Sequence, residues 1–267
     1  MNFYIDTHAH YSDNAYDADR EELLGSLAAE NVGIVIDPAV DVASAEKAIS
    51  IGKGRDGYYC AAGIHPHECG DADADDYMRL EELLKGARER KIVAVGETGL
   101  DYHYDFAPKE KQHDNFRRNI ELALRYRLPL IVHDREAHKD TYDILLSEGG
   151  FETRVLFHCY SGSGVFSAEL LKKGCYFSFG GAVTFKNARK FEEVVGSLPS
   201  DRILPETDSP YMSPEPRRGR RNDSTNLKYI YPRLALYMKL PPEKVFEVFC
   251  ANTARFFEID LDKRLAY

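Results

Sequence analysis

Short apolar segments alternate with amphipathic segments along the chain. Apolar runs rich in Val and Ile predict buried strands at residues 4–6, 33–38, 58–64, 93–95, 129–132, 154–157, 176–179 and 203–204. Apolar residues spaced three or four positions apart predict helices at residues 19–30, 42–51, 75–90, 108–126, 141–148, 165–173, 187–198, 225–239 and 242–257. Each predicted strand is therefore followed by a predicted helix.

This alternation indicates an α/β protein. Eight strands, each with a helix after it and no low-complexity linker, predict a single (β/α)8 TIM barrel domain over residues 1–267. An open doubly wound sheet is the alternative. Its dinucleotide-binding form needs a Gly-x-Gly-x-x-Gly loop after the first strand, and the sequence has no such motif there.

Histidines and acids stand at the ends of the predicted strands. They are His8 and His10 after the first strand, His65 after the third, Glu97 after the fourth, His133 after the fifth, His158 after the sixth and Asp208 after the eighth. The carboxyl ends of barrel strands meet on one face, so these side chains are expected to converge. Imidazole and carboxylate together predict a metal centre. For a single histidine the alternative is core packing, and for Glu97 it is a solvated loop.

The spacing suggests how two divalent ions divide these ligands. His8 and His10 are two residues apart on an extended segment, which puts both side chains on the same side. We expect His8, His10 and Asp208 to hold one ion, His133 and His158 to hold the second, and Glu97 to bridge them. Carboxylates and phosphate chemistry suit Mg²⁺, and three or more imidazoles tolerate Mn²⁺ and Zn²⁺, so we expect Mg²⁺ or Mn²⁺ with Zn²⁺ as a further candidate.

Paired divalent ions predict hydrolysis at phosphorus by an activated water. Asp208 is expected to orient or deprotonate that water, unless it only caps a helix after Pro210. His65 is expected to hydrogen-bond a phosphoryl oxygen or protonate a leaving group, with strand-end packing against Pro66 as the alternative.

Composition limits the partners of the chain. A net charge of −9 argues against coating nucleic acid by bulk electrostatics, so an anionic substrate needs a local attraction. No apolar run is long enough to span a membrane and the first residues do not resemble a signal peptide, so we expect a cytoplasmic protein without a membrane partner. No obligate protein partner is indicated. The 5 cysteines never occur as Cys-x-x-Cys and are expected to be free thiols.

Two sets of residues are candidates for contacting nucleic acid. Arginines expected on the active face are Arg135, two residues after His133, and the cluster Arg217, Arg218, Arg220 and Arg221 after Asp208. The cluster's alternative role is a solvated surface. Aromatic residues near metal-bearing strands, which either stack on bases or belong to the core, are Tyr102, Tyr104, Phe106 and Tyr160.

A set of motifs occurs between residues 6 and 222: His8-Ala9-His10, Gly63-Ile64-His65-Pro66-His67, Gly96-Glu97-Thr98-Gly99-Leu100-Asp101-Tyr102, Gln112 with Phe116, Pro129-Leu130-Ile131-Val132-His133-Asp134-Arg135, His158-Cys159-Tyr160-Ser161-Gly162, Glu206-Thr207-Asp208-Ser209-Pro210 and Arg218-Gly219-Arg220-Arg221-Asn222. Together they resemble the TatD family of metal-dependent deoxyribonucleases. The resemblance implies an amidohydrolase-superfamily barrel, two divalent ions, and hydrolysis of DNA phosphodiesters, in relatives as a 3′-to-5′ exonuclease on single strands.

The resemblance also implies residue roles: His65 beside the site, and as ligands His8, His10, Glu97, His133, His158 and Asp208. The chain departs from the family in small ways. Relatives often carry Phe where Tyr160 stands, and a proline soon after the Arg-Asn pair where this chain has Asn222-Asp223-Ser224. The second difference concerns the shape of the arginine loop, and through it the substrate preference.

Three functions remain to be separated. The first is a metal-dependent nuclease that acts on DNA, with RNA as a further candidate substrate. The second is a hydrolase of the same fold that acts on a small ester, lactone or amide; such relatives often bridge their metals with a modified lysine on the fourth strand, where this chain has Glu97. The third is a binding protein that keeps the barrel without catalysis, which predicts a missing ligand, and none is missing.

Overall fold

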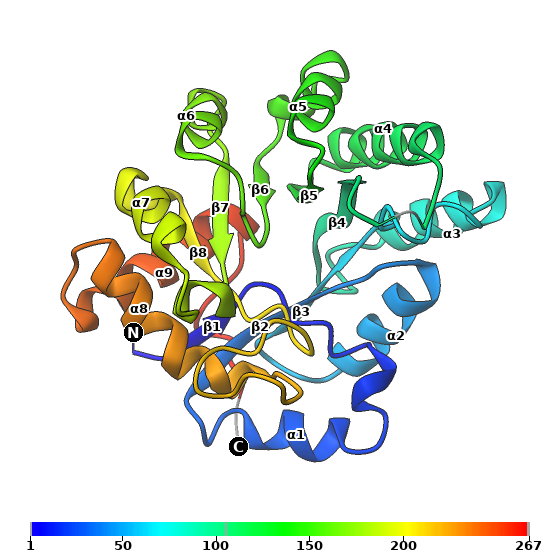
Figure 1. Ribbon diagram of the computed structural model, residues 1–267. Helices are drawn as coiled ribbons and strands as arrows, with labels where there is room; N and C mark the ends of the chain where they lie inside the picture. The colour runs from blue at the N-terminus through cyan, green and yellow to red at the C-terminus, as the bar shows by residue number, and fades with distance from the viewer. Residues whose placement is uncertain (1, 105, 266–267) are drawn as a thin grey trace.

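A computed structural model of the chain describes residues 2–104 and 106–265. Eight parallel strands form one sheet in sequence order, and the helices lie around its outside (Figure 1). The strands are β1 (Tyr4–Asp6), β2 (Val32–Pro38), β3 (Tyr58–Ala62), β4 (Ile92–Asp101), β5 (Leu130–Arg135), β6 (Val155–Phe157), β7 (Tyr176–Phe179) and β8 (Ile203–Pro205). The predicted (β/α)8 barrel is confirmed.

The helices follow the strands as the apolar spacing predicts. They are α1 (Arg20–Ser26), α2 (Val42–Gly52), α3 (Ala74–Lys85), α4 (Lys109–Tyr126), α5 (His138–Ser147), α6 (Gly164–Lys172), α7 (Arg189–Ser197), α8 (Leu227–Tyr237) and α9 (Pro242–Phe257). Short 3-10 turns are η1 (Asn14–Tyr16), η2 (Gly150–Glu152), η3 (Gly181–Thr184), η4 (Ser200–Arg202) and η5 (Ser224–Asn226). None of the described helices combines the length and apolarity that crossing a membrane requires.

Backbone contacts between the segments that follow β1 and β8 bring the two ends of the sheet together. The Thr7 N–H donates to the Pro205 carbonyl at 3.1 Å, and Ala9 forms an isolated parallel bridge with Ser209. These segments carry His8, His10 and Asp208. Closure of the barrel therefore also brings these side chains together.

The barrel interior is filled by one apolar residue or more from most strands. Ile36, Ala61, Ala94, Ile131, Leu156 and Leu204 belong to one buried cluster. Phe256 and Phe257 of α9 join the same cluster, and Phe256 packs on Tyr176, the first residue of β7, at 5.0 Å between ring centroids. α9 thus closes the amino-terminal end of the barrel and leaves the carboxyl ends of the strands for the polar residues.

β4 is longer than its apolar run predicts, and this corrects the expected position of Glu97. The strand continues to Asp101, and its register with β5 shifts between Val95 and Thr98 before pairing resumes. Gly96 has φ +146°, and a Cβ there would lie 2.7 Å from the Ile131 carbonyl oxygen, so only glycine fits. Glu97 therefore lies at an irregularity inside β4 rather than beyond its end.

Other boundaries differ by a few residues. β5 extends to Arg135, so His133 lies inside the strand rather than after it. α1 ends at Ser26 and α3 at Lys85, several residues before the predicted ends. Turns fill the remaining residues before β2 and β4. Gly86 stands at the C-cap of α3, where glycine commonly ends a helix.

A buried carboxylate joins three segments at the closure of the barrel. Asp6, at the end of β1, accepts hydrogen bonds from the Thr207 N–H at 2.9 Å and the Thr207 hydroxyl at 2.6 Å. It also accepts one from the Ser224 hydroxyl at 2.6 Å. All three residues are fully buried, so water cannot replace Asp6 as the acceptor.

We expect Asp6→Ala to lower the free energy of unfolding by about 3 kcal/mol, because it leaves buried donors without an acceptor. Urea denaturation of the metal-free protein measures this change. Asp143→Ala, at an exposed position of α5, is the control and should change the free energy by less than about 0.5 kcal/mol. Equal effects of the two substitutions would show that Asp6 does not stabilise the closure.

Candidate metal centre

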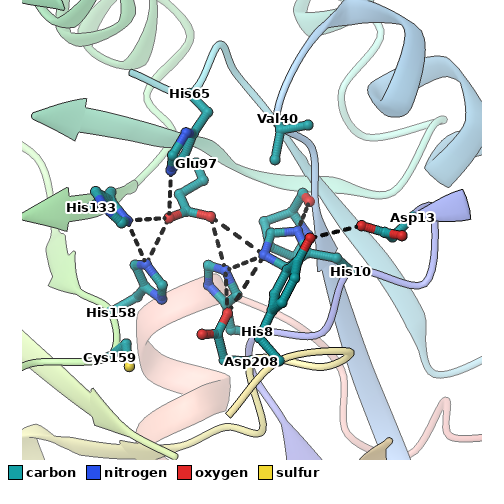
Figure 2. A network of polar contacts seen from close by, with 12 residues as sticks. His8, His10, Asp13, Val40, His65, Glu97, His133, His158, Cys159 and Asp208 are labelled. Atoms are coloured by element: carbon teal, nitrogen blue, oxygen red, sulfur yellow. Dashed lines mark hydrogen bonds and ion pairs between the residues drawn. The ribbon is translucent and has the colours of Figure 1, made fainter. Parts of the chain in front are cut away.

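The side chain of Glu97 lies between two groups of histidines at the mouth of the barrel (Figure 2). Its Oε1 atom faces His158 and His133, at 2.7 Å from Nε2 and 2.8 Å from Nδ1 respectively. The Nε2 atom of His65 lies 3.3 Å from the same oxygen. One carboxylate oxygen therefore meets imidazoles from β5, from the end of β6 and from the segment after β3.

The other oxygen of Glu97 faces the segment after β1. Its Oε2 atom lies 3.1 Å from His8 Nε2 and 3.5 Å from His10 Nε2. The Oδ1 atom of Asp208 lies 4.0 Å and 3.7 Å from the same two nitrogens. The structure thus brings together all six residues expected from the sequence to bind metal, with Glu97 between the two groups.

Candidate ligand atoms are close enough to share an ion on each side of Glu97. Atoms of His8, His10 and Glu97 lie within 4.8 Å of one another, and so do atoms of Glu97, His133 and His158. No lysine or arginine pairs with Glu97 in the part of the chain that the structure describes. A buried carboxylate that faces only imidazoles fits divalent cations well.

Hydrogen-bond acceptors behind His10 and His133 orient these two rings as ligands. The Nδ1 atom of His10 lies 2.9 Å from the Pro38 carbonyl oxygen, which can only accept, so Nδ1 carries a proton and, in the neutral ring, the Nε2 lone pair faces Glu97. His133 is reversed: its Nε2 lies 2.9 Å from Asp101, and Nδ1 faces the site. His158 turns Nε2 toward Glu97, at 2.7 Å from Oε1, while its buried Nδ1 has no hydrogen-bond partner in the described part of the chain and lies 3.8 Å from the Glu206 carboxylate.

His65 has the opposite arrangement. The backbone N–H of His67 donates to His65 Nδ1 at 3.1 Å, so Nδ1 is an acceptor and the proton of the neutral ring is on Nε2. That Nε2 points at Glu97. Burial lowers the pKa of His65 to about 4, which keeps the ring neutral. His65 therefore offers an N–H donor to the site rather than a lone pair.

Burial and the surrounding charges set the protonation states without metal. Burial would raise the pKa of Glu97, but the imidazoles around it hold that pKa well below its usual value. Burial would lower the pKa of His10, yet Asp208 and Glu97 raise it to about 9. Burial would also lower the pKa values of His133 and His158, but neighbouring carboxylates raise both: Asp101 and Glu97 at His133, and Glu97 and Glu206 at His158. Protonated imidazoles thus balance the Glu97 charge.

Asp208 has no capping role. Its backbone has φ +59°, its N–H donates to the His8 carbonyl at 2.8 Å, and no helix begins between residues 209 and 223. The Asp208 side chain is 14% exposed, whereas that of Glu97 is 3% exposed. Asp208 is therefore positioned between the His8–His10 pair and solvent.

Sequence reasoning missed two buried acids that support the cluster. Asp101 accepts from His67 and His133 through Oδ2, and from the backbone N–H groups of His103 and Tyr104 through Oδ1. Glu206 accepts from the Cys159 N–H at 2.7 Å and the Ser178 hydroxyl at 2.6 Å. Both acids lie at strand ends and within the motifs described above. These two features of the sequence could have identified them as residues of the site.

The predicted arginine contacts divide into two kinds. Arg221 is paired with Asp19 and lies over the Tyr16 ring. Arg218 donates to the Ser213 carbonyl and lies over the Phe185 ring. Arg135 and Arg220 are exposed, and their guanidinium groups have no hydrogen-bond partner among residues 2–104 and 106–265.

The four aromatic residues considered for base stacking differ in their exposure and contacts. Tyr160 is buried and donates to the Ser163 carbonyl, so it belongs to the core. The Tyr102 hydroxyl bonds to Asp140, and Lys109 covers its ring. Tyr104 and Phe106 are exposed at the mouth of the barrel.

Known proteins resemble the chain over nearly its whole length. A family model described as "TatD related DNase" matches residues 5–258. The uncharacterized metal-dependent hydrolase YabD of Bacillus subtilis is 38% identical over 256 residues, which are 96% of this chain and 99% of that protein. The uncharacterized metal-dependent hydrolase YcfH of Escherichia coli K12 is 32% identical over 264 residues, 98% of each.

A solved structure shows the same arrangement. The crystal structure of YJJV, a TatD homolog from Escherichia coli K12, superposes with a TM-score of 0.89 at 28% identity. The superposition covers 96% of this chain and 98% of that one. The likeness therefore includes the complete barrel and not only the motifs at its mouth.

We expect metal affinity to rise with pH between 6 and 8.5. His10, His133 and His158 have raised pKa values without metal, so they hold protons that a divalent ion must displace. Calorimetric titration with Mn²⁺ in buffers of different ionisation enthalpy counts the released protons. Absence of proton release at pH 7, or an affinity that does not change with pH, would contradict this assignment.

We expect Asp101→Asn to weaken metal binding by about 10- to 100-fold. An amide at this position must turn its NH₂ toward either the two histidines or the two backbone N–H groups, so one pair of donors loses its acceptor. Mn²⁺ titration measures the affinity. Asp114→Asn, at an exposed site on α4, is the matched control. Equal affinities in both variants would show that Asp101 does not support the site.

Proposed function

The chain belongs to the TatD-related DNase family of metal-dependent hydrolases, and from this membership we propose that it is a deoxyribonuclease that hydrolyses DNA phosphodiester bonds. Its mode of action in this proposal is 3′-to-5′ exonucleolytic cleavage of single strands. RNA is a second candidate substrate. The proposal involves no obligate protein partner, and the six candidate metal ligands belong to one chain.

The observation that supports the proposal most is the division of the two Glu97 oxygens between two groups of imidazoles. In the proposal His8, His10 and Asp208 would hold one divalent ion, His133 and His158 would hold a second, and Glu97 would be shared between them. The ions are Mg²⁺ or Mn²⁺, with Zn²⁺ as an alternative. When bound, such a pair makes water a better nucleophile at neutral pH and balances the charge that develops on phosphate oxygens.

The protein's own residues supply orientation and proton transfer. Asp208 is partly exposed and faces the His8–His10 pair, so its carboxylate is placed to orient a water and accept its proton. His65 is placed to donate its Nε2 proton in a hydrogen bond to a phosphoryl oxygen. Glu97 fixes the spacing of the imidazoles.

The exposed arginines favour a substrate that carries several negatively charged groups. In the proposal Arg135, Arg218, Arg220 and Arg221 contact phosphate groups. Arg135 and Arg220 are available without breaking a contact, whereas Arg221 must exchange its pair with Asp19. Phosphate contacts position a polynucleotide without reading its sequence.

A hydrolase of small esters, lactones or amides is the alternative function. Relatives of that kind often bridge their metals with a modified lysine, and Glu97 in the bridging position favours the nuclease. Comparison of the rates on p-nitrophenyl esters, lactones and oligonucleotides separates the two. Faster hydrolysis of the small substrates would favour the alternative.

We expect the protein with Mg²⁺ or Mn²⁺ to shorten a 5′-labelled single-stranded DNA stepwise from its 3′ end. Glu97→Gln removes the negative charge between the two groups of histidines. It should reduce the rate by more than about 100-fold, because loss of a group that only supports a ligand already reduces activity by up to about 100-fold. The control is Glu169→Gln on the outside of α6. Gel electrophoresis resolves the products. DNA left intact with each of Mg²⁺, Mn²⁺ and Zn²⁺ would overturn the proposed function.

We expect Arg135→Ala with Arg220→Ala to raise KM for single-stranded DNA. Removal of two phosphate contacts should also reduce the slope of log KM against log salt by about 1.4. Arg218→Ala with Arg221→Ala should have a smaller effect, because those guanidinium groups already bind protein atoms. Steady-state kinetics at several salt concentrations measure both effects. An unchanged KM at low salt in both double variants would exclude the arginines as substrate contacts.

A further inference from the structure

The exposed aromatic side chains are concentrated beside the metal centre. Large hydrophobic side chains exposed in the described part of the chain are Met78, Tyr104, Phe106, Leu146, Val165, Tyr211 and Leu236. Single exposed aliphatic residues are normal on a protein surface. All three aromatic residues of this set, by contrast, lie within ring-contact distance of a histidine at the site.

Tyr104 and Phe106 form one aromatic surface. Their rings stack with centroids 5.5 Å apart and an interplanar angle of 18°, and they are 48% and 64% exposed. The His67 ring makes T-shaped contacts with both, at 5.5 Å and 4.7 Å between centroids. His67 in turn lies 4.4 Å from the ring of His65. This surface therefore adjoins the His65 and His133 side of Glu97.

Hydrogen bonds connect Tyr104 to the metal centre. The Tyr104 backbone N–H donates to Asp101 Oδ1 at 2.9 Å, while Asp101 Oδ2 accepts from His67 and His133. The backbone of Tyr104 is thus held by the same carboxylate that orients His133. Phe106 adjoins this arrangement through its ring contacts with Tyr104 and His67.

Tyr211 provides an aromatic surface on the other side. Its ring lies 6.3 Å from that of His10, it is 56% exposed, and its hydroxyl donates to Asp13 at 3.0 Å. Figure 2 shows His10 and His133 on opposite sides of Glu97. The metal centre therefore lies between the Tyr104–Phe106 pair and Tyr211.

We propose that the Tyr104–Phe106 pair and Tyr211 are two base-stacking subsites, which hold unpaired bases on either side of the scissile phosphate. This inference rests on the proposed nuclease function. The rings are open to solvent and every nucleobase has a π-face, so the subsites accept any sequence. The exposed guanidinium of Arg135, two residues after His133, serves the intervening phosphate.

The subsites account for a preference for single strands. Bases in a duplex are stacked on each other and paired, so they must be unstacked before a ring of the protein can take the place of a neighbouring base. An unpaired end has already lost its pairing. Stacking on the protein therefore costs less for a single strand than for a duplex.

The kinetic test compares a single-stranded oligonucleotide with the same backbone carrying abasic sites beside the scissile phosphate. The ratio of kcat/KM for these two substrates should fall about tenfold in Tyr104→Ala with Phe106→Ala, and also in Tyr211→Ala. Phe106→Trp should keep the ratio. Leu236→Ala is the matched control because Leu236, at 63%, is as exposed as Phe106 and lies on α8. Ratios equal to that of the unchanged protein in both aromatic variants would overturn the inference.

A binding test does not depend on hydrolysis. A phosphorothioate oligonucleotide with 2-aminopurine beside its 3′-terminal linkage should lose fluorescence when it binds, and its Kd should weaken about tenfold in the double variant. Manganese content checks that each variant keeps its site. Where the double variant loses metal, Phe106→Leu keeps apolar volume without a ring and should give the same loss of quenching.

The two tests separate the two proposals. A protein that quenches 2-aminopurine through Tyr104 and Phe106 but cuts no DNA would overturn the nuclease proposal and leave the subsites in place. A protein that cuts DNA with no difference between these variants would overturn the subsites alone. Weaker quenching in the Leu236→Ala control, equal to that in the double variant, would also overturn them.

Discussion

The buried charge of Glu97 determines the arrangement around it. A carboxylate in this environment is stable only where positive charge compensates it. Without metal, protonated imidazoles provide that charge, and the raised pKa values of His10 and His158 are the result. Divalent ions held by these imidazoles would provide the same compensation after displacing the protons. The barrel makes this possible because parallel strands deliver side chains from distant parts of the sequence to one face.

The group behind each imidazole decides what that imidazole offers to the site. An acceptor behind the ring, such as the Pro38 carbonyl or the Asp101 carboxylate, accepts a hydrogen bond from one ring N–H, so in the neutral ring the lone pair is on the other nitrogen. A donor behind the ring, as at His65, reverses this and points a proton inward. Histidines at similar strand ends therefore differ in role. The group hydrogen-bonded to the far side of the ring decides whether a histidine is a candidate ligand or a hydrogen-bond donor.

Local sequence signals predicted the strands and the convergence of polar residues, because apolar periodicity and strand ends are properties of short segments. The extension of β4 was missed since Gly96 interrupts the apolar run, and only the pairing of residues 98–101 with β5 shows that the strand continues. The pairing of Arg221 with Asp19 was equally invisible, because the two residues are far apart in sequence. The supporting role of Glu206 depends on Ser178 and Cys159, which other segments supply.

Asp101 shows why a supporting acid matters beyond the metal centre. Its two oxygens hold His133 on one side and the backbone of the Tyr104 loop on the other. Because all four donors meet one buried carboxylate, the orientation of His133 and the position of the Tyr104 backbone depend on the same side chain. Positioning contributes to rate enhancement when the group that binds a substrate and the group that acts on it are held relative to each other. Asp101, at the end of β4, connects the Tyr104 backbone in this way to an imidazole that faces Glu97.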